Sequence, residues 1–153
     1  MSGTKAPASC ATIELEIPIE APCERVWEAI FKETNFWWMP NFRVSGENSQ
    51  VTFDPTPGGR GMVEESEDGG GLLWFTVQMY LPSKFAVYLF GHIAPEWGGP
   101  QTSNLKLALE ETSTGCIMKV TDARHGHIDD MTSYADGWRQ IFTDGLKKLN
   151  LAI

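Results

Sequence analysis

Apolar and acidic residues alternate strictly near the start of the chain, in the segment 11–19. Successive side chains of a strand point to opposite faces, so this pattern predicts a strand with one buried and one exposed face. The apolar members are Ile13, Leu15 and Ile17. Residues 1–10, which are rich in Ser, Ala and Pro, are expected to be a frayed N-terminus. A single domain is expected to cover residues 11–153.

The spacing of apolar residues changes after this strand and becomes helical. Val26, Trp27, Ile30 and Phe31 fall on one face of a helix that begins near Pro22 and runs to about residue 32. A second, short helix is expected over residues 35–39, which Pro40 ends.

Extended segments separated by strong turn signals make up the middle of the chain. The turns contain Pro57-Gly58-Gly59, the glycine run 69–71 and Ser113-Thr114-Gly115. Short turns join antiparallel neighbours, so an antiparallel meander is predicted. The predicted strands cover residues 43–54, 60–67, 71–81, 84–92, 103–111 and 115–125.

The last predicted element is a long helix that starts after Asp129 or Asp130, either of which would cap it. About twenty residues would give a rod about 30 Å long. Its apolar stripe consists of Tyr134, Ala135, Trp138, Ile141, Phe142, Gly145 and Leu149. Only this helix is long enough to cover one face of the meander. The predicted class is therefore α+β, with a curved seven-stranded antiparallel sheet around a C-terminal helix.

Two glycines in this last helix leave two readings open. Gly137 and Gly145 are two turns apart, and each costs about 1 kcal/mol of helix propensity relative to alanine. Either the helix backbone lies very close to the sheet at these positions, or the missing side chains leave room for a ligand.

Composition and charge exclude several classes of partner. The chain has 153 residues and a formal net charge of −8, and its twelve basic residues are scattered. Nucleic acids and anionic membranes bind clustered Lys and Arg, so neither is an expected partner. The sequence has no run of about 18 apolar residues and no leader-like start. Three widely spaced cysteines suggest reduced thiols and a cytoplasmic location.

Asp122 and Arg124 are the first candidate polar anchors. They share a strand face with Met118 and Val120, and these two apolar residues mark the face as inward. The pair could meet a polar group of a ligand on the concave side of the sheet. The alternative is a partly solvated ion pair at the end of a strand.

Glu64 shares a strand face with Arg60 and Met62. If buried in an apolar cavity, this carboxyl would have a raised pKa and could act as a general acid or base. The favoured reading is an outward charge that protects an edge strand from aggregation.

Histidine and cysteine chemistry is weakly indicated. His125 and His127 lie two apart on a strand and could face one metal with Asp129 or His92, but no third ligand is fixed and no metal is expected. Cys23 stands near a helix start, where its thiol could be activated or could simply be packed.

The chain is rich in tryptophan, with six residues of this type. Large aromatic side chains fill cores and also line pockets for apolar or ring-bearing ligands. Trp97 lies in a loop rich in Gly and Pro, which favours a position at a pocket mouth. The others considered for a pocket are Trp37, Trp38, Trp74 and Trp138.

Several short segments together resemble the SRPBCC superfamily, the START and birch-pollen-allergen-like helix-grip proteins. Within it, the chain resembles small bacterial proteins related to the C-terminal domain of the activator of the ninety-kilodalton heat-shock protein ATPase. The matching segments are Ile19-Glu20-Ala21-Pro22, Glu24-Arg25-Val26-Trp27-Glu28-Ala29, Trp37-Trp38, Phe53-Asp54-Pro55-Thr56-Pro57-Gly58-Gly59-Arg60, Leu81-Pro82 and Gly137-Trp138.

This resemblance implies a helix-grip fold with two small helices after the first strand and a cavity for apolar ligands. It carries over no catalytic residue, because cavity residues differ between subfamilies. The family often has a bulky aromatic residue where this chain has Gly61, and its absence would widen the cavity or let Trp74 fill the gap.

The leading hypothesis is a protein that binds a small hydrophobic or aromatic molecule between the sheet and the last helix, without a cofactor. The alternatives are an enzyme resembling polyketide cyclases or hydrolases, and a co-chaperone-like regulator that binds a protein; a homodimer is compatible with each. An enzyme would need Glu64, Asp122, Arg124 or His125 inside the cavity. The expected ligand-binding residues are Trp37, Trp38, Arg60, Trp74, Trp97, Met118, Asp122, Arg124 and Trp138.

Overall fold

The computed structural model describes residues 3–92, 94–97, 100–149 and 151. Within this part of the chain, seven strands form one antiparallel sheet in the order β1-β7-β6-β5-β4-β3-β2. The fold is therefore the predicted α+β arrangement, in which a meander returns its last strand to pair with the first. The strands are β1 (Ser9–Ile19), β2 (Gln50–Asp54), β3 (Gly61–Glu65), β4 (Gly71–Leu81), β5 (Ala86–His92), β6 (Pro100–Thr112) and β7 (Gly115–Gly126).

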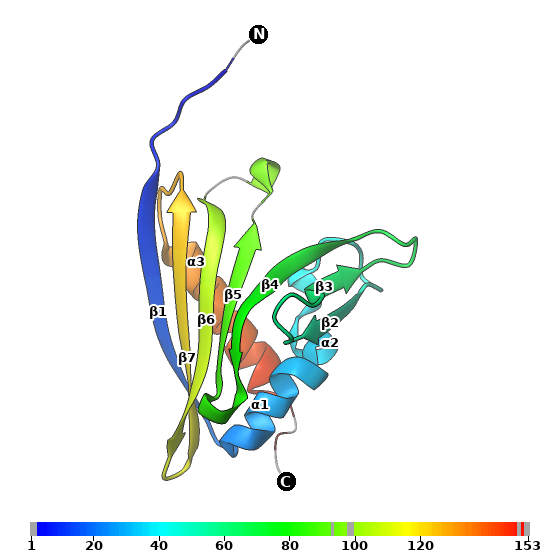
Figure 1. Cartoon of the computed structure of the whole chain (residues 1–153), viewed down its shortest axis with the longest axis vertical. Helices are drawn as coiled ribbons and strands as arrows, with labels where there is room; N and C mark the ends of the chain where they lie inside the picture. The colour runs from blue at the N-terminus through cyan, green and yellow to red at the C-terminus, as the bar shows by residue number, and fades with distance from the viewer. Residues whose placement is uncertain (1–2, 93, 98–99, 150, 152–153) are drawn as a thin grey trace.

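The helices lie on one side of this sheet. Helix α1 (Cys23–Lys32) and the short α2 (Thr34–Trp37) follow β1, and α3 (Thr132–Gln140) follows β7. In Figure 1, α3 crosses behind β7, β6 and β5, while α1 and α2 lie beside β2 and β3 at the other end of the sheet. The long strand β4 joins the two parts and bends strongly between them.

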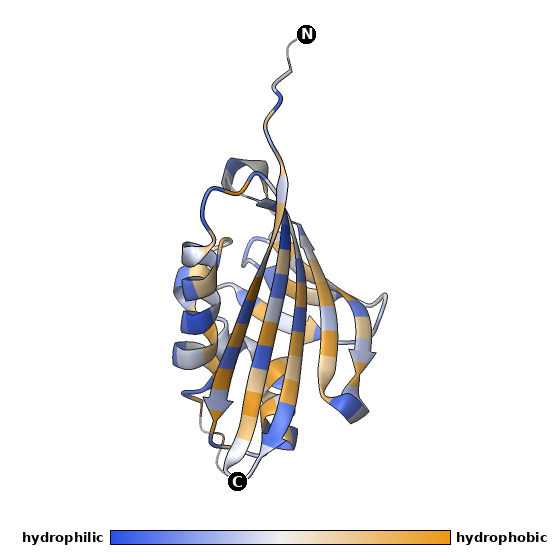
Figure 2. Ribbon diagram, turned by 90° about the vertical axis from the view of Figure 1, so that its left-hand side faces the viewer, coloured by the Kyte–Doolittle hydropathy of each residue, from blue (hydrophilic) through white to orange (hydrophobic). Residues whose placement is uncertain are grey.

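The register of the long strands follows from their alternating sequence. Figure 2 shows blue and orange positions alternating along the strands, with the helices on one side of the sheet. In β7 every second residue from Cys116 to Arg124 is buried, which confirms the inward face predicted for this strand. Leu105 of β6 pairs with Asp122, and Ser103 pairs with Arg124. Polar groups of two neighbouring strands therefore meet on the concave face.

The C-terminal helix is regular in its first half only. After α3 the chain continues as a π-helical segment, Ile141–Leu146, in which the Lys147 amide donates to the carbonyl of Phe142 five residues earlier. The predicted single α-helix of about twenty residues is thus wrong in detail. Asp130, one of the two predicted caps, accepts a 2.9 Å hydrogen bond from the amide of Thr132, the first residue of α3.

Two other boundaries differ from the prediction. Strand β1 starts at Ser9, inside the segment that was expected to be frayed. Strand β2 starts at Gln50 rather than near residue 43. The preceding loop is held by Arg43, whose guanidinium donates to the carbonyl groups of Trp38 and Ser49. Such long-range bonds to backbone groups leave no pattern in the sequence.

None of the helices in the described part of the chain is long and apolar enough to span a membrane.

Candidate ligand-binding site

A cavity of about 210 Å³ lies between the concave face of the sheet and helix α3. Most of its wall is aromatic and comes from the α2–β2 connection, from β4 and from α3. The aromatic lining residues are Trp38, Phe42, Trp74, Phe75, Tyr134 and Trp138. Polar groups are contributed by His92, Ser103, Arg124 and Ser133. His92 and Ser133 are exposed, so they mark the side on which the cavity meets solvent.

A buried hydrogen-bonded cluster supports one wall of the cavity. Asp122 is fully buried, and its carboxylate accepts hydrogen bonds from the hydroxyl of Ser103 at 2.6 Å and from the indole N–H of Trp138 at 2.7 Å. The guanidinium Nε of Arg124 donates to the same carboxylate at 2.7 Å. These bonds replace the water that a buried carboxylate loses. Asp122 is thus held behind the wall, while Ser103, Arg124 and Trp138 line it.

Arg124 is placed by a second contact as well as by Asp122. Its guanidinium carbon lies 4.4 Å from the centre of the Tyr134 ring, in a cation–π arrangement with helix α3. The residue is 8% exposed. The reading of Asp122 and Arg124 as a partly solvated pair at a strand end is therefore wrong, because the pair is buried on the concave face.

The two glycines of the C-terminal helix have different surroundings. A Cβ atom on Gly145 would come well inside van der Waals distance of the carbonyl oxygen of Trp37. A Cβ atom on Gly137 would meet only the ring of Phe42, at 3.9 Å, and Gly137 lines the cavity. Gly137 therefore fits the reading in which a missing side chain leaves room for a ligand. Gly145 does allow a close backbone approach, but its neighbour is α2 and not the sheet.

Glu64 supports another wall of the cavity from behind. It is fully buried and accepts hydrogen bonds from the amides of Val44 and Ser45, from the Ser45 hydroxyl, and from the indole N–H of Trp74 at 3.1 Å. Burial opposes ionisation and is the largest single influence on its pKa. The hydrogen bonds from Ser45, Trp74 and Val44 together outweigh it, so the pKa of Glu64 lies below its ordinary value.

Both predictions for Glu64 are corrected by this arrangement. The side chain is not an outward charge on an edge strand, and its carboxyl does not have the raised pKa of a general acid. The donors come from the loop at Val44 and Ser45 and from Trp74 on β4, so the pattern of β3 did not indicate them.

The expected ligand-binding residues fall into three groups in the structure. Trp38, Trp74, Arg124 and Trp138 line the cavity. Asp122 touches two of these residues, and Trp97 stacks on Trp74 with a ring-centre distance of 5.9 Å while 44% of its surface is exposed. The structure places the remaining three outside the cavity wall; they are Trp37, Arg60 and Met118.

These three residues have other partners. Trp37 is buried, and its indole N–H donates to the carbonyl groups of Ala29 and Ile30 at the end of α1. Met118 lies in the core, fully buried. Arg60 is exposed and pairs with Glu65 at 2.7 Å, on the rim of the sheet. Core packing or a surface ion pair therefore accounts for each of them.

The wall also contains residues that the sequence did not single out for ligand binding, namely Phe42, Phe75, Ser103 and Ser133. Ser103 had one detectable signal, because it is polar and sits opposite Arg124 on the inward face of β6. Using that signal would have required the register between β6 and β7. Phe42 gave no signal, since it lies in a short 3₁₀ turn, Pro40–Phe42.

Gly61 is not a gap left by a missing aromatic side chain. Its φ is +73°, and a Cβ atom there would overlap the carbonyl oxygen of Phe75 on the neighbouring strand. This backbone conformation is one that L side chains rarely adopt. Neither alternative given for Gly61, a wider cavity or a gap filled by Trp74, describes this position, because a side chain has no room here.

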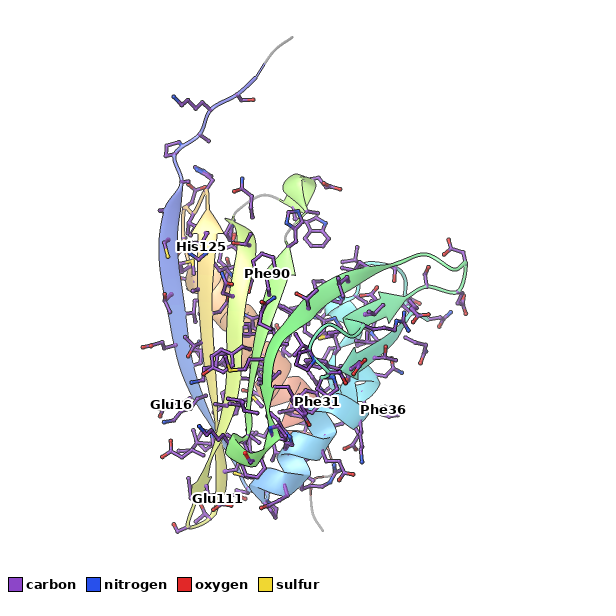
Figure 3. The ribbon with its side chains drawn as sticks, in the orientation of Figure 1. Glu16, Phe31, Phe36, Phe90, Glu111 and His125 are labelled. Atoms are coloured by element: carbon purple, nitrogen blue, oxygen red, sulfur yellow. The ribbon has the colours of Figure 1, made fainter. Side chains whose placement is uncertain are left out.

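His125 and His127, which were considered as metal ligands, do not line the cavity. His125 is exposed toward the end of β7, where it contacts Cys10 and Asn104 (Figure 3). His127 pairs with Asp129 at 3.2 Å. Among the described residues, no three His, Cys, Asp or Glu side chains gather closely enough to hold a metal ion.

The buried thiols are not activated. Burial raises the pKa of Cys23, and burial together with the neighbouring Cys23 thiol raises the pKa of Cys116 to about 12. A thiol with a raised pKa is a poor nucleophile at neutral pH. Cys23 is therefore a packed residue at the start of α1.

Comparison with solved structures identifies the class of fold. A protein from Mesorhizobium loti, MLL2253, is 23% identical, with a TM-score of 0.65 over 91% of this chain and 96% of that one. Truncated norcoclaurine synthase from Thalictrum flavum is 13% identical, with a TM-score of 0.62 over 98% and 99%. Ara h 8.0201 is 14% identical, with a TM-score of 0.60 over 92% and 94%. At these identities the likeness shows a shared fold, that of the SRPBCC, or helix-grip, superfamily.

The sequence narrows this class to one family. The family model described as "Activator of Hsp90 ATPase homolog 1-like protein" matches residues 20–150, so the chain belongs to that family. A search of curated proteins gives no match. Proteins with this fold typically bind hydrophobic ligands, which agrees with an aromatic cavity between sheet and helix.

Proposed function

We propose that this protein binds a small hydrophobic or aromatic molecule in the cavity between the sheet and α3. The observation that carries the proposal is an aromatic cavity of about 210 Å³ that Gly137 keeps open on the helix side. Burying an apolar ring there would remove aromatic and aliphatic surface from water, which contributes about 25 cal/mol per Å². Trp38, Trp74 and Trp138 would make the main contacts.

Catalysis receives less support than binding. An enzyme would need at least one of Glu64, Asp122, Arg124 and His125 inside the cavity, and of these four only Arg124 lines it. No Asp or Glu side chain belongs to the described lining, and the carboxylates of Glu64 and Asp122 lie behind the wall with their hydrogen bonds occupied. The cavity thus offers one fixed cation and the exposed His92, but no carboxylate base.

A co-chaperone-like role and a cytoplasmic location remain predictions. The family description names an activator of an Hsp90 ATPase, which is a property of the protein after which the family is named. A homodimer likewise remains a prediction.

The proposal can be tested with a neutral aromatic probe, 4-fluorotoluene, followed by ¹⁹F NMR. We expect saturable binding to the wild-type protein and loss of that binding in Gly137→Leu, whose side chain would occupy the cavity. Gly137→Ala is the matched control, because a methyl group fits beside Phe42 and leaves most of the volume free. Absence of saturable binding to the wild type, or equal binding by Gly137→Leu, would contradict the proposal.

A further inference from the structure

The described wall of the cavity contains one permanently charged side chain, the guanidinium of Arg124. Only 8% of the surface of this residue is exposed to solvent. A buried cation is costly unless its N–H groups find acceptors. The hydrogen-bond partners of this cation therefore bear on what the cavity accepts.

Arg124 uses only part of its hydrogen-bonding capacity within the protein. A guanidinium carries five N–H donors, and among the described residues the bond to Asp122 comes from Nε alone. The Tyr134 ring, 4.4 Å away, covers one face of the group and accepts no in-plane hydrogen bond from it. The terminal nitrogens are thus the donors that a ligand could use.

Asp122 engages only the Nε side of the Arg124 guanidinium. Its carboxylate is also stabilised by two neutral donors, the Ser103 hydroxyl at 2.6 Å and the Trp138 indole at 2.7 Å. Together with the Tyr134 ring, this carboxylate holds the guanidinium plane in one orientation. Asp122 is therefore a positioning residue for Arg124 and not itself a contact for the ligand.

A second unpaired donor lies in the same wall. The indole N–H of Trp38, a lining residue that is 3% exposed, is buried without an acceptor among the described residues. Buried donors are nearly always paired in folded proteins, so an unpaired one calls for an explanation. The indole N–H of Trp27, outside the cavity, is unpaired as well, so the argument rests mainly on Arg124. A ligand that brings oxygen atoms could accept from the terminal nitrogens of Arg124 and from the indole N–H of Trp38.

The volume and shape of the cavity limit the part of the ligand that does not contact Arg124. An engineered apolar cavity of about 150 Å³ accommodates benzene, so about 210 Å³ suits one aromatic ring with a small substituent. The walls from Trp38, Trp74 and Phe75 suit the ring. A carboxylate matches the planar fork of a guanidinium with two parallel hydrogen bonds, whereas a single hydroxyl would use one.

We propose that the cavity binds a one-ring aromatic carboxylate, with the carboxylate on the terminal nitrogens of Arg124 and the ring packed against the aromatic side chains of the wall. The inference rests on the proposed function, since it names the chemical class of the ligand for the same cavity. Asp122 would orient the guanidinium, and α3 would cover the ring.

The test compares three probes of nearly equal size by ¹⁹F NMR titration: 4-fluorobenzoate, 4-fluorobenzamide and 4-fluorotoluene. Wild-type protein should bind the carboxylate at least about tenfold more tightly than the amide, as expected for a charge-assisted pair that replaces a neutral hydrogen bond. This comparison needs no variant, so it stays decisive if substitutions at Arg124 impair folding.

Two substitutions test whether Arg124 is responsible for the tighter binding of the carboxylate. Arg124→Gln should abolish the advantage of the carboxylate while leaving 4-fluorotoluene binding in place, and Arg124→Lys should restore part of it because the charge returns without the fork. Arg139→Gln is the matched control, since Arg139 is an exposed cation of α3 that pairs with Asp136. It should bind the carboxylate like the wild type.

The outcomes separate this inference from the proposed function. If wild type binds the amide or the hydrocarbon as tightly as the carboxylate, or if Arg124→Gln keeps the carboxylate advantage, the inference is overturned while the cavity remains a hydrophobic site. If none of the three probes binds, both proposals fall.

Discussion

Each half of the C-terminal helix contains one glycine, and the surroundings of the two glycines differ. At the end of the chain, in the π-helical segment, Gly145 lets the helix backbone touch the carbonyl of Trp37. Two turns earlier, Gly137 faces the ring of Phe42 across ordinary contact distance and borders a cavity. Gly145 therefore lets the helix pack closely against α2, whereas Gly137 leaves space beside the cavity.

The difference shows how one helix can be an anchor and a cavity wall at once. The packed half buries Phe142 and Leu146 and contacts α2. The open half carries Tyr134, whose ring lies against the guanidinium of Arg124, and Trp138, whose indole N–H donates to Asp122. Stability is therefore concentrated in one half, so the other can keep an unfilled volume.

The largest effect is expected from Gly145→Ala in the packed half. The new methyl group would overlap the backbone of Trp37, which cannot rotate away as a side chain could, and overpacking of this kind costs about 1–3 kcal/mol. We expect a loss near the upper end of that range in the free energy of unfolding, measured by urea denaturation. A stability equal to that of the wild type would break the contrast between the two halves.

A somewhat smaller effect is expected from Glu64→Gln, which acts on the cavity side. The amide of glutamine cannot accept from all the donors that now surround the carboxylate, so we expect a loss of about 2 kcal/mol at pH 7. Urea denaturation at a series of pH values would measure it.

The pH dependence of this difference has a definite sign. Because the pKa of Glu64 is lower in the folded protein, its ionisation stabilises the fold above the unfolded-state pKa of about 4.3. This stabilisation is lost as the pH falls through the folded-state pKa. The gap between wild type and Glu64→Gln should therefore narrow on acidification; a gap that widens in acid would contradict the role given to the carboxylate.

The smallest effect is expected from Gly137→Ala, and it has the opposite sign. The methyl group meets only Phe42 at 3.9 Å, while alanine gains up to about 1 kcal/mol of helix propensity over glycine. Thermal unfolding should show a melting temperature a few degrees higher than that of the wild type. A decrease would mean that the open half is as tightly packed as the other.

The sequence predicted the sheet, the helix that covers it and the inward face of β7, because alternation and helical spacing are local patterns. It also brought Trp38, Trp74, Arg124 and Trp138 together as ligand candidates, although it could not separate them from Trp37 and Met118. Separating them requires knowing which side chains lie at the open half of the C-terminal helix, and contacts between distant segments decide that.

Contacts between distant segments explain the remaining differences. The partners of Glu64 come from the loop at Val44 and Ser45, and the partner of Asp122 on β6 depends on strand register. The π-helical segment arises from a shift in backbone pairing that apolar spacing does not reveal. None of these features has a local signature in the chain.

The ring contacts in the cavity wall also have an optical consequence. Trp38 lies 5.0 Å from Trp74 and 6.4 Å from Trp138, and Trp74 lies 5.9 Å from Trp97, measured between ring centres. Indoles this close share their electronic excitations, so the wall behaves as one coupled chromophore in near-ultraviolet circular dichroism. The protein thereby carries its own label-free reporter of whatever binds against these rings.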